Sequence, residues 1–229
     1  MTKKKILGSL PLAVSIGLIG LAGAAWGAGG QTEAFCNTTA ITIPVSGDQG
    51  VASLYPTTIT ASAMPPSVTK ITVQLLGLSH TFPGDLDIML VGPQGGQVIL
   101  MSDVGGGTDI SNVDLIFDDG APSAPAAPIT TGAYQPSNTG AGDPFPAPAP
   151  AGTPGTQLAG FNGSNPNGTW SLYIVDDAGA DVGSMNGWCV NITSEIPSPT
   201  AVPTMSGLGL GLLSGLLALG AFWQRRRRG

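Results

Sequence analysis

The chain has 229 residues, of which 35 are glycine, 20 are proline and only 10% are charged. This composition favours a turn-rich all-β domain and excludes a protein built from long helices. The net charge of −6 hides a separation, because the basic residues gather at the two ends while all 14 carboxylates lie between them with Lys70 alone. The central region therefore carries 1 − 14 = −13, a charge that repels phosphate backbones and excludes nucleic-acid binding.

Residues 1–27 have the layout of a secretory signal peptide. Three lysines precede an apolar run over 6–25, and small residues occupy both cleavage-determining positions, Ala25 and Gly27. We expect cleavage near Gly27, with an uncleaved anchor helix as the alternative because the apolar run is long. The body is then secreted across the inner membrane into an oxidising compartment, where Cys36 and Cys189 are expected to form a disulfide.

Residues 31–194 are interpreted as one β-sandwich. After a short polar lead over 31–37, apolar and polar residues alternate with the period of two that a half-buried strand requires. About eight strands at this spacing predict a jelly-roll-like sandwich. The predicted strands are 41–45, 54–62, 70–78, 85–91, 97–102, 113–117, 170–175 and 188–192.

The alternation stops over residues 121–154, where nine prolines mix with Ala, Gly, Ser and Thr. Such a segment is a long surface excursion with polyproline character or a disordered loop. Only two closing strands follow it, which is too little for a second core. We therefore interpret it as an insertion within one sandwich.

The carboxy-terminal segment has three parts. Residues 195–205 form a proline-rich stalk, and residues 206–223 form an apolar run. As a helix, 18 residues span about 27 Å, close to the thickness of a bilayer core. Residues 224–229 hold the cluster Arg225, Arg226, Arg227 and Arg228, which is expected to stay cytoplasmic and leave the sandwich outside.

The sequence predicts no catalytic constellation. A Ser-His-Asp hydrolase needs a histidine base beside its nucleophile, and the single histidine, His80, precedes a predicted strand in a turn. We expect it to pack against Phe82. P-loop, paired-histidine zinc and C-x-x-C motifs do not occur in the sequence either.

Calcium is the ligand that the carboxylates favour, because it binds six to eight oxygens, often on glycine-containing loops. Asp177 and Asp181 lie in one glycine-rich turn with Asp176 before it, and Asp85 and Asp87 are two residues apart on one predicted strand face. These five are the candidate calcium ligands. The alternative is that they are solvated turn aspartates, which shape loops without a metal.

Several ordered motifs make residues 82–193 resemble the P domain (Homo B domain) of proprotein convertases and bacterial subtilisin-like proteases. The resemblance implies a jelly-roll β-sandwich that flanks a serine-type endopeptidase or stands alone on a secreted protein, without being the catalyst. The motifs are PGDLDIML over 83–90, Gly92-Pro93, FDD over 117–119, GAYQP over 132–136, LAGF over 158–161, NGTW over 167–170 and the segment 176–188.

The tail resembles the bacterial sorting signal written IPTLxxWG, which precedes a membrane helix and an arginine cluster. The matching residues are Val202, Pro203, Thr204 and Met205. The resemblance implies a surface protein that is membrane-anchored before an exosortase-type enzyme processes it.

Three functions are compatible with these observations. The first is a non-catalytic, surface-anchored module for interaction, adhesion or envelope structure, with an extracellular protein as partner. The second is an accessory domain of a subtilisin-like protease. The third is a carbohydrate-binding module, which needs Trp170 and Trp188 as an exposed platform for a glycan rather than as core residues.

Overall fold

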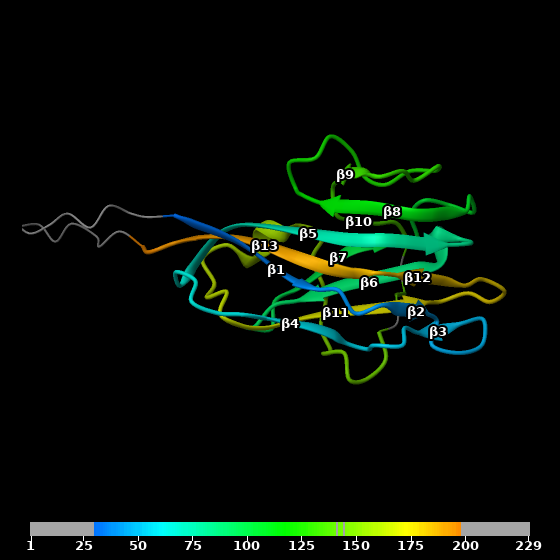
Figure 1. The fold of residues 1–229 in the computed structure, drawn as a ribbon, viewed down its shortest axis with the longest axis horizontal. Helices are drawn as coiled ribbons and strands as arrows, with labels where there is room; N and C mark the ends of the chain where they lie inside the picture. Colours follow the sequence, from blue (N-terminus) through cyan, green and yellow to red (C-terminus); the bar gives the residue numbers. More distant parts are fainter. Residues whose placement is uncertain (1–29, 141, 144, 198–229) are drawn as a thin grey trace, which may run out of the picture.

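Two β-sheets face one another in the computed structural model, which describes residues 30–140, 142–143 and 145–197 (Figure 1). The predicted signal peptide, sorting motif, membrane helix and arginine cluster lie outside these residues. In the described part of the chain, no helix is long and apolar enough to cross a membrane. The all-β sandwich that the alternation predicts is confirmed.

The first sheet has the order β1-β13-β5-β12-β2, and β8 extends it from β5 to β9. All its pairs are antiparallel except β8 with β9. Its strands are β1 (Gln31–Asn37), β2 (Ile41–Ile43), β5 (Ser67–His80), β8 (Ile110–Phe117), β9 (Gly132–Tyr134), β12 (Gly183–Met185) and β13 (Gly187–Glu195).

The second sheet has the order β10-β7-β6-β11-β3, with β4 also paired to β11. Short 3-10 helices, η1 (Pro83–Asp85) and η2 (Leu158–Phe161), lie in the connections. Its strands are β3 (Gly50–Val51), β4 (Thr57–Ala61), β6 (Leu86–Val91), β7 (Gln97–Ser102), β10 (Ser137–Asn138) and β11 (Gly168–Asp176).

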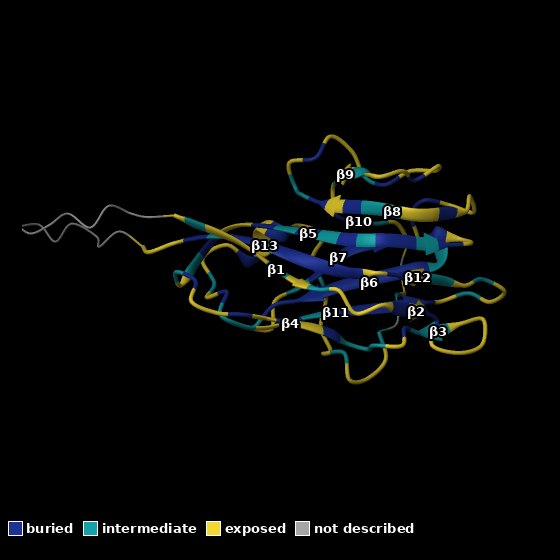
Figure 2. Cartoon of the chain, viewed as in Figure 1, coloured by how far each residue is buried: buried dark blue, intermediate teal, exposed yellow. Residues whose placement is uncertain are grey.

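The core lies between the sheets and is built from inward-facing residues of both. The ribbon of the central strands β6, β11 and β13 is coloured largely as buried in Figure 2. Trp170 on β11 and Trp188 on β13 are both 0% exposed, and each indole N–H donates a hydrogen bond, to the carbonyl of Pro166 and to Thr57 Oγ1 respectively. Satisfying its single polar atom allows a tryptophan to be fully buried. A second small apolar cluster on the outer face of the second sheet contains Met89, Val91, Ile99 and Tyr173.

Strand β1 pairs along its whole length with β13, with Gln31 opposite Ser194. Both chain ends therefore leave the sandwich at the same end (Figure 1). The predicted disulfide is present: Cys36 lies directly opposite Cys189, with 4.1 Å between their Cα atoms.

The structure corrects the sequence interpretation at several elements. There are thirteen strands in the described residues rather than about eight, since strands of two or three residues are too short to show alternation. Residues 31–37, expected to be a polar lead, form edge strand β1, whose stability comes from pairing with β13. The proline-rich insertion 121–154 includes β9 and β10, which pair with β8 and β7.

Candidate functional site

A row of polar side chains crosses the outer face of the second sheet. On β6, Leu86 and Ile88 point into the core, so Asp87 points outward. Ser102 at the end of β7 donates a hydrogen bond from Oγ to Asp87 Oδ1 at 2.6 Å. Ser102 is also in register with Asn138 on β10, so the row spans three adjacent strands.

The row continues into the proline-rich insertion. Asn138 Nδ2 donates to Asp143 Oδ2 at 2.6 Å. Asp103 lies beside it, with its carboxylate against Gly140 and its carbonyl accepting a hydrogen bond from Thr139 Oγ1. We call Asp87, Ser102, Asn138 and Asp143 the outer-face polar row.

Asp87 is buried in this row, at 1% exposed. Burial raises the pKa of Asp87 to about 7, against the opposing effect of the Ser102 hydrogen bond, and the nearby Asp143, Asp177 and Asp103 raise it further. The pKa of Asp103 is raised by burial and by Asp143. The row therefore concentrates negative charge where water is largely excluded.

A cavity of about 330 Å³ opens beside the row. Asn138 and Asp143 line it together with Met89, Ile99 and the stretch 150–154 of the insertion. The insertion thus covers the outer face of the second sheet and leaves a solvent-accessible recess next to the carboxylates.

Asp176, a second buried carboxylate, lies on the opposite side of the sheet. It ends β11 on the inward face, and its Oδ2 is 3.3 Å from Nε2 of His80, with both side chains fully enclosed. The Phe82 backbone N–H donates to His80 Nδ1, so the imidazole proton of the neutral ring is on Nε2, toward the carboxylate. Burial raises the pKa of Asp176, and His80 opposes this rise.

His80 is therefore wrongly predicted as a turn residue that packs against Phe82. It ends β5 and is 1% exposed, and its contact with Phe82 is through the backbone. At this position the imidazole is shielded from solvent, and its contact with Asp176 links β5 of the first sheet to β11 of the second.

The remaining candidates lie in loops at the end of the sandwich opposite the chain termini. Asp85 belongs to η1 rather than to a strand face shared with Asp87, and its carbonyl accepts a hydrogen bond from the Asp177 backbone N–H. Asp181 Oδ1 accepts a hydrogen bond from Thr81 Oγ1. Burial raises the pKa of Asp85, with Asp181, Asp176 and Asp177 adding to the rise.

The five predicted calcium ligands thus occupy three environments instead of one. Asp85, Asp177 and Asp181 are in the loops, Asp176 is in the core, and Asp87 is on the outer face. Within residues 30–140, 142–143 and 145–197, no three His, Cys, Asp or Glu side chains form a group that could hold a metal ion. Asn138 and Asp143 were missed because neither their alternation nor their spacing relates them to β6.

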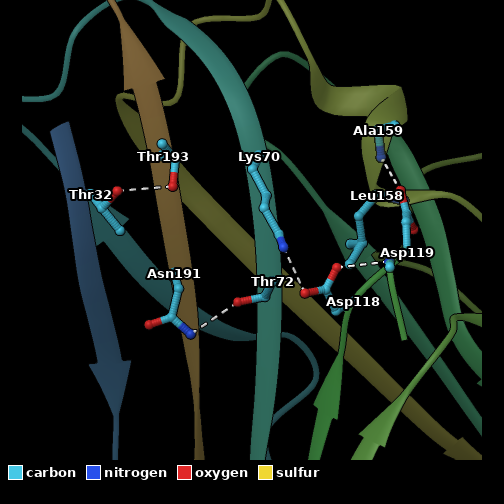
Figure 3. A network of polar contacts seen from close by, with 10 residues as sticks. Thr32, Lys70, Thr72, Asp118, Asp119, Leu158, Ala159, Asn191 and Thr193 are labelled. Atoms are coloured by element: carbon cyan, nitrogen blue, oxygen red, sulfur yellow. Dashed lines mark hydrogen bonds and ion pairs between the residues drawn. The ribbon is translucent and has the colours of Figure 1, made fainter. Parts of the chain in front are cut away.

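The outer face of the first sheet carries polar side chains that hydrogen-bond with one another (Figure 3). Thr32 and Thr193 join β1 to β13, and Asn191 and Thr72 join β13 to β5. At one edge of the network, Asp119 accepts hydrogen bonds from the backbone N–H groups of Leu158 and Ala159, at 2.9 and 2.7 Å, which ties β8 to η2.

In the same network Lys70 forms an ion pair with Asp118 at 2.7 Å. Partial burial would raise the pKa of Asp118, but hydrogen bonds from Lys70 and the Gly120 backbone hold it below its usual value. Lys70 is the single lysine or arginine of the described residues, so the carboxylates elsewhere in this region have no lysine or arginine partner.

Comparison with known proteins identifies one segment of the chain. Residues 200–228 match the IPTL-CTERM motif family. This range includes the predicted sorting residues 202–205. The class of protein is therefore an all-β sandwich with a carboxy-terminal sorting motif. Such a motif indicates a secreted bacterial protein anchored at the cell surface.

The sandwich itself has weaker likenesses. A comparison with curated proteins finds no match. Among solved structures, the Aeromonas sobria serine protease in complex with its chaperone ORF2 is 17% identical over 73% of this chain, with a TM-score of 0.35. The crystal structure of the serine protease of Aeromonas sobria is 16% identical over 72%, with a TM-score of 0.33. The chain spans only 28% and 27% of those two chains.

Proposed function

We propose that this chain is a non-catalytic interaction module of P-domain type, held at a bacterial surface with its loops directed away from the membrane. The carrying observation is the full-length pairing of β1 with β13, which sends both chain ends out at one end of the sandwich. The stalk and sorting motif follow β13, so the opposite end is the one presented to partners (Figure 1).

The presented end, which we call the distal loops, is defined by residues 44–50, 81–85 and 177–182. Backbone hydrogen bonds hold these loops together: Thr81 N–H donates to the Val182 carbonyl, and Asp177 N–H donates to the Asp85 carbonyl. β2 and β12 also pair just before the loops, with Ile43 opposite Gly183. Segments far apart in the sequence therefore form one surface.

The distal loops combine exposed apolar side chains with carboxylates. Val45, Phe82 and Val182 are 53%, 40% and 55% exposed, and the carboxylates are Asp48, Asp85, Asp177 and Asp181. No lysine or arginine occurs in these loops. Such a surface fits a positively charged protein that contributes an apolar side chain, because charge gives the rate and selectivity of encounter while apolar contact gives affinity.

The tether follows from the tail. Residues 206–223 would hold the precursor in the inner membrane with the arginine cluster in the cytoplasm, and an exosortase-type enzyme would cleave near residues 202–205. The carbohydrate-binding alternative loses its basis, since Trp170 and Trp188 are buried and cannot stack on a glycan. A subtilisin-like protease remains a partner class to be tested.

The test uses the full chain expressed in a bacterium that displays proteins with this sorting motif. Photo-crosslinking groups placed at Val45 and Val182 should capture a basic surface protein, and the double change Asp177→Asn/Asp181→Asn should reduce capture at least fivefold. The matched control, Glu33→Gln/Glu195→Gln, removes the same charge at the tethered end and should leave capture unchanged.

Two results decide against the proposal. If capture is unchanged in the distal-loop variant but falls in the Glu33→Gln/Glu195→Gln control, the partner binds the tethered end and the proposed orientation is wrong. A chain that lacks residues 200–229 is the reference for release. If the full chain is released into the medium to the same extent with its tail intact, surface anchoring is refuted. Capture of a subtilisin-like enzyme would assign the accessory role instead.

A further inference from the structure

We propose that the outer-face polar row binds one calcium ion, with ligands from Asp87, Asn138 and Asp143 and with Ser102 fixing the orientation of Asp87. This site differs from the calcium site that the sequence predicts, since it joins β6 to the proline-rich insertion and does not use the distal loops. It is also independent of the proposed function.

Two buried oxygens in the row have no hydrogen-bond donor. Asp87 Oδ2 is one of them, on a side chain that is 1% exposed, and Asn138 Oδ1 is the other. A buried carboxylate oxygen without a donor is costly, because the folded state offers nothing in place of the water it has lost. Each of these two side chains already uses its other polar atom, in the bonds with Ser102 and Asp143.

The strand register places the two side chains that carry these oxygens on one face of the sheet. Asp87 on β6 is beside Ser102 on β7, and Ser102 is opposite Asn138 on the parallel strand β10. Two strand spacings separate the β6 and β10 backbones by roughly 10 Å. Two short side chains and an ion with bonds of about 2.3–2.6 Å can span that distance.

The charge around the row calls for a cation. Asp103 and Asp143 surround Asn138, and no lysine or arginine lies in residues 82–140, 142–143 or 145–161. In contrast, Asp118 has Lys70 and the Gly120 N–H as partners. Among the described residues, the carboxylates of Asp87 and Asp143 receive side-chain hydrogen bonds from one hydroxyl and one amide, both uncharged, so neither carboxylate is paired with a positive charge.

The donor set selects calcium among common cations. All the available atoms are oxygens of carboxylate, amide and hydroxyl groups, the hard ligands that calcium and magnesium prefer. Asp143 follows Gly140 and Gly142 outside the regular strands, a setting that suits the flexible geometry of calcium better than the strict octahedron of magnesium. The adjacent cavity, lined by Asn138 and Asp143, gives the ion and its water ligands access.

The experiment is a calorimetric titration of the full chain in detergent, stripped with chelator and then given calcium chloride, with melting temperature measured in parallel. We expect one calcium per chain and a rise in melting temperature. Asp87→Asn and Asp143→Asn should each weaken binding at least tenfold, while magnesium should bind more weakly than calcium. Asp143 lies outside the regular strands, so its variant tests the site independently of any change in the sheet at Asp87.

Asp181→Asn is the matched control, because it removes a carboxylate from the distal loops without touching the row. It should bind calcium as the unmodified chain does. The proposal is overturned if the chain shows no calcium heat and no change in melting temperature at millimolar calcium. It is also overturned if Asp87→Asn and Asp143→Asn titrate normally, or if Asp181→Asn alone abolishes binding.

Discussion

The buried carboxyl of Asp87 makes a definite prediction about stability and pH in the absence of metal. Its pKa is about 7 in the folded protein, against an ordinary value of 3.8. Because the folded-state pKa is the higher one, the folded protein binds the proton more tightly than the unfolded chain, and the contribution of Asp87 to stability is lost as pH rises. The loss begins above 3.8 and is complete above about 7.

The size of this loss follows from the shift. Each pKa unit corresponds to about 1.4 kcal/mol, so the full titration removes roughly 4 kcal/mol, of which about 2–3 kcal/mol falls between pH 5 and pH 8. Asp87→Asn removes the titrating group, while its amide oxygen can still accept the hydrogen bond from Ser102. The variant should therefore be more stable than the unmodified chain by about 1.5 kcal/mol at pH 5 and by roughly 4 kcal/mol at pH 8.

The assay is urea denaturation of the full chain in chelator at several pH values between 5 and 8, monitored by the fluorescence of the buried tryptophans. Asp109→Asn, an exposed carboxylate with no side-chain hydrogen bond in the described residues, serves as the control and should follow the unmodified chain. If Asp87→Asn loses stability in parallel with the unmodified chain over this range, the buried charge at Asp87 is not the cause and the reasoning fails.

Three further predictions concern contacts that hold the sandwich together. Cys36→Ser/Cys189→Ser should lower the free energy of unfolding by about 5 kcal/mol, because the disulfide closes a loop of 153 residues in the unfolded chain. Equal denaturation midpoints of the unmodified chain with and without reductant would contradict this. Asp119→Ala should lose about 1–3 kcal/mol with the two backbone hydrogen bonds to η2, and should speed protease cleavage just before residue 158. Gly77→Ala should lower the free energy of unfolding by about 1–3 kcal/mol, because Gly77 has φ +59° and a Cβ there meets the Asn186 side chain. In the same thermal melt Gly95→Ala should be less destabilising, since Gly95 has φ +82° but open space around its Cβ position.

The sequence predicts the parts of the fold that period and turn chemistry control. Alternation over β5, β6, β7 and β11 locates those strands within a few residues, because each has one face in the core. Strand β1 escaped detection since most of its residues are exposed on both faces, and its strand conformation depends on hydrogen bonds to β13. Because β1 pairs with a strand far away in the sequence, its own residues carry no local pattern that predicts a strand.

The candidate site was predictable only in part, for a related reason. The sequence marks Asp87 as a potential ligand but groups it with Asp85, as two residues on one strand face. A 3-10 turn at Pro83–Asp85 separates them, so Asp85 joins the distal loops while Asp87 faces outward. Asn138 and Asp143 reach the site through β10, a strand of two residues inside a proline-rich stretch.

Two of the attachments that hold the proline-rich insertion and its flanks against the sandwich differ in character. The first lies just outside the insertion, where both carboxylate oxygens of Asp119 accept backbone hydrogen bonds from η2 and hold the two flanks together. At the outer-face polar row, the apolar contacts of Phe145 and Ala149 with the cluster around Met89 favour closure, while the carboxylates of Asp87 and Asp143 oppose it. A cation in the row would change the second attachment from opposed to favoured without altering the first. Occupancy would then control how tightly residues 145–154 cover the sheet, and the sandwich beneath would keep the same strand order.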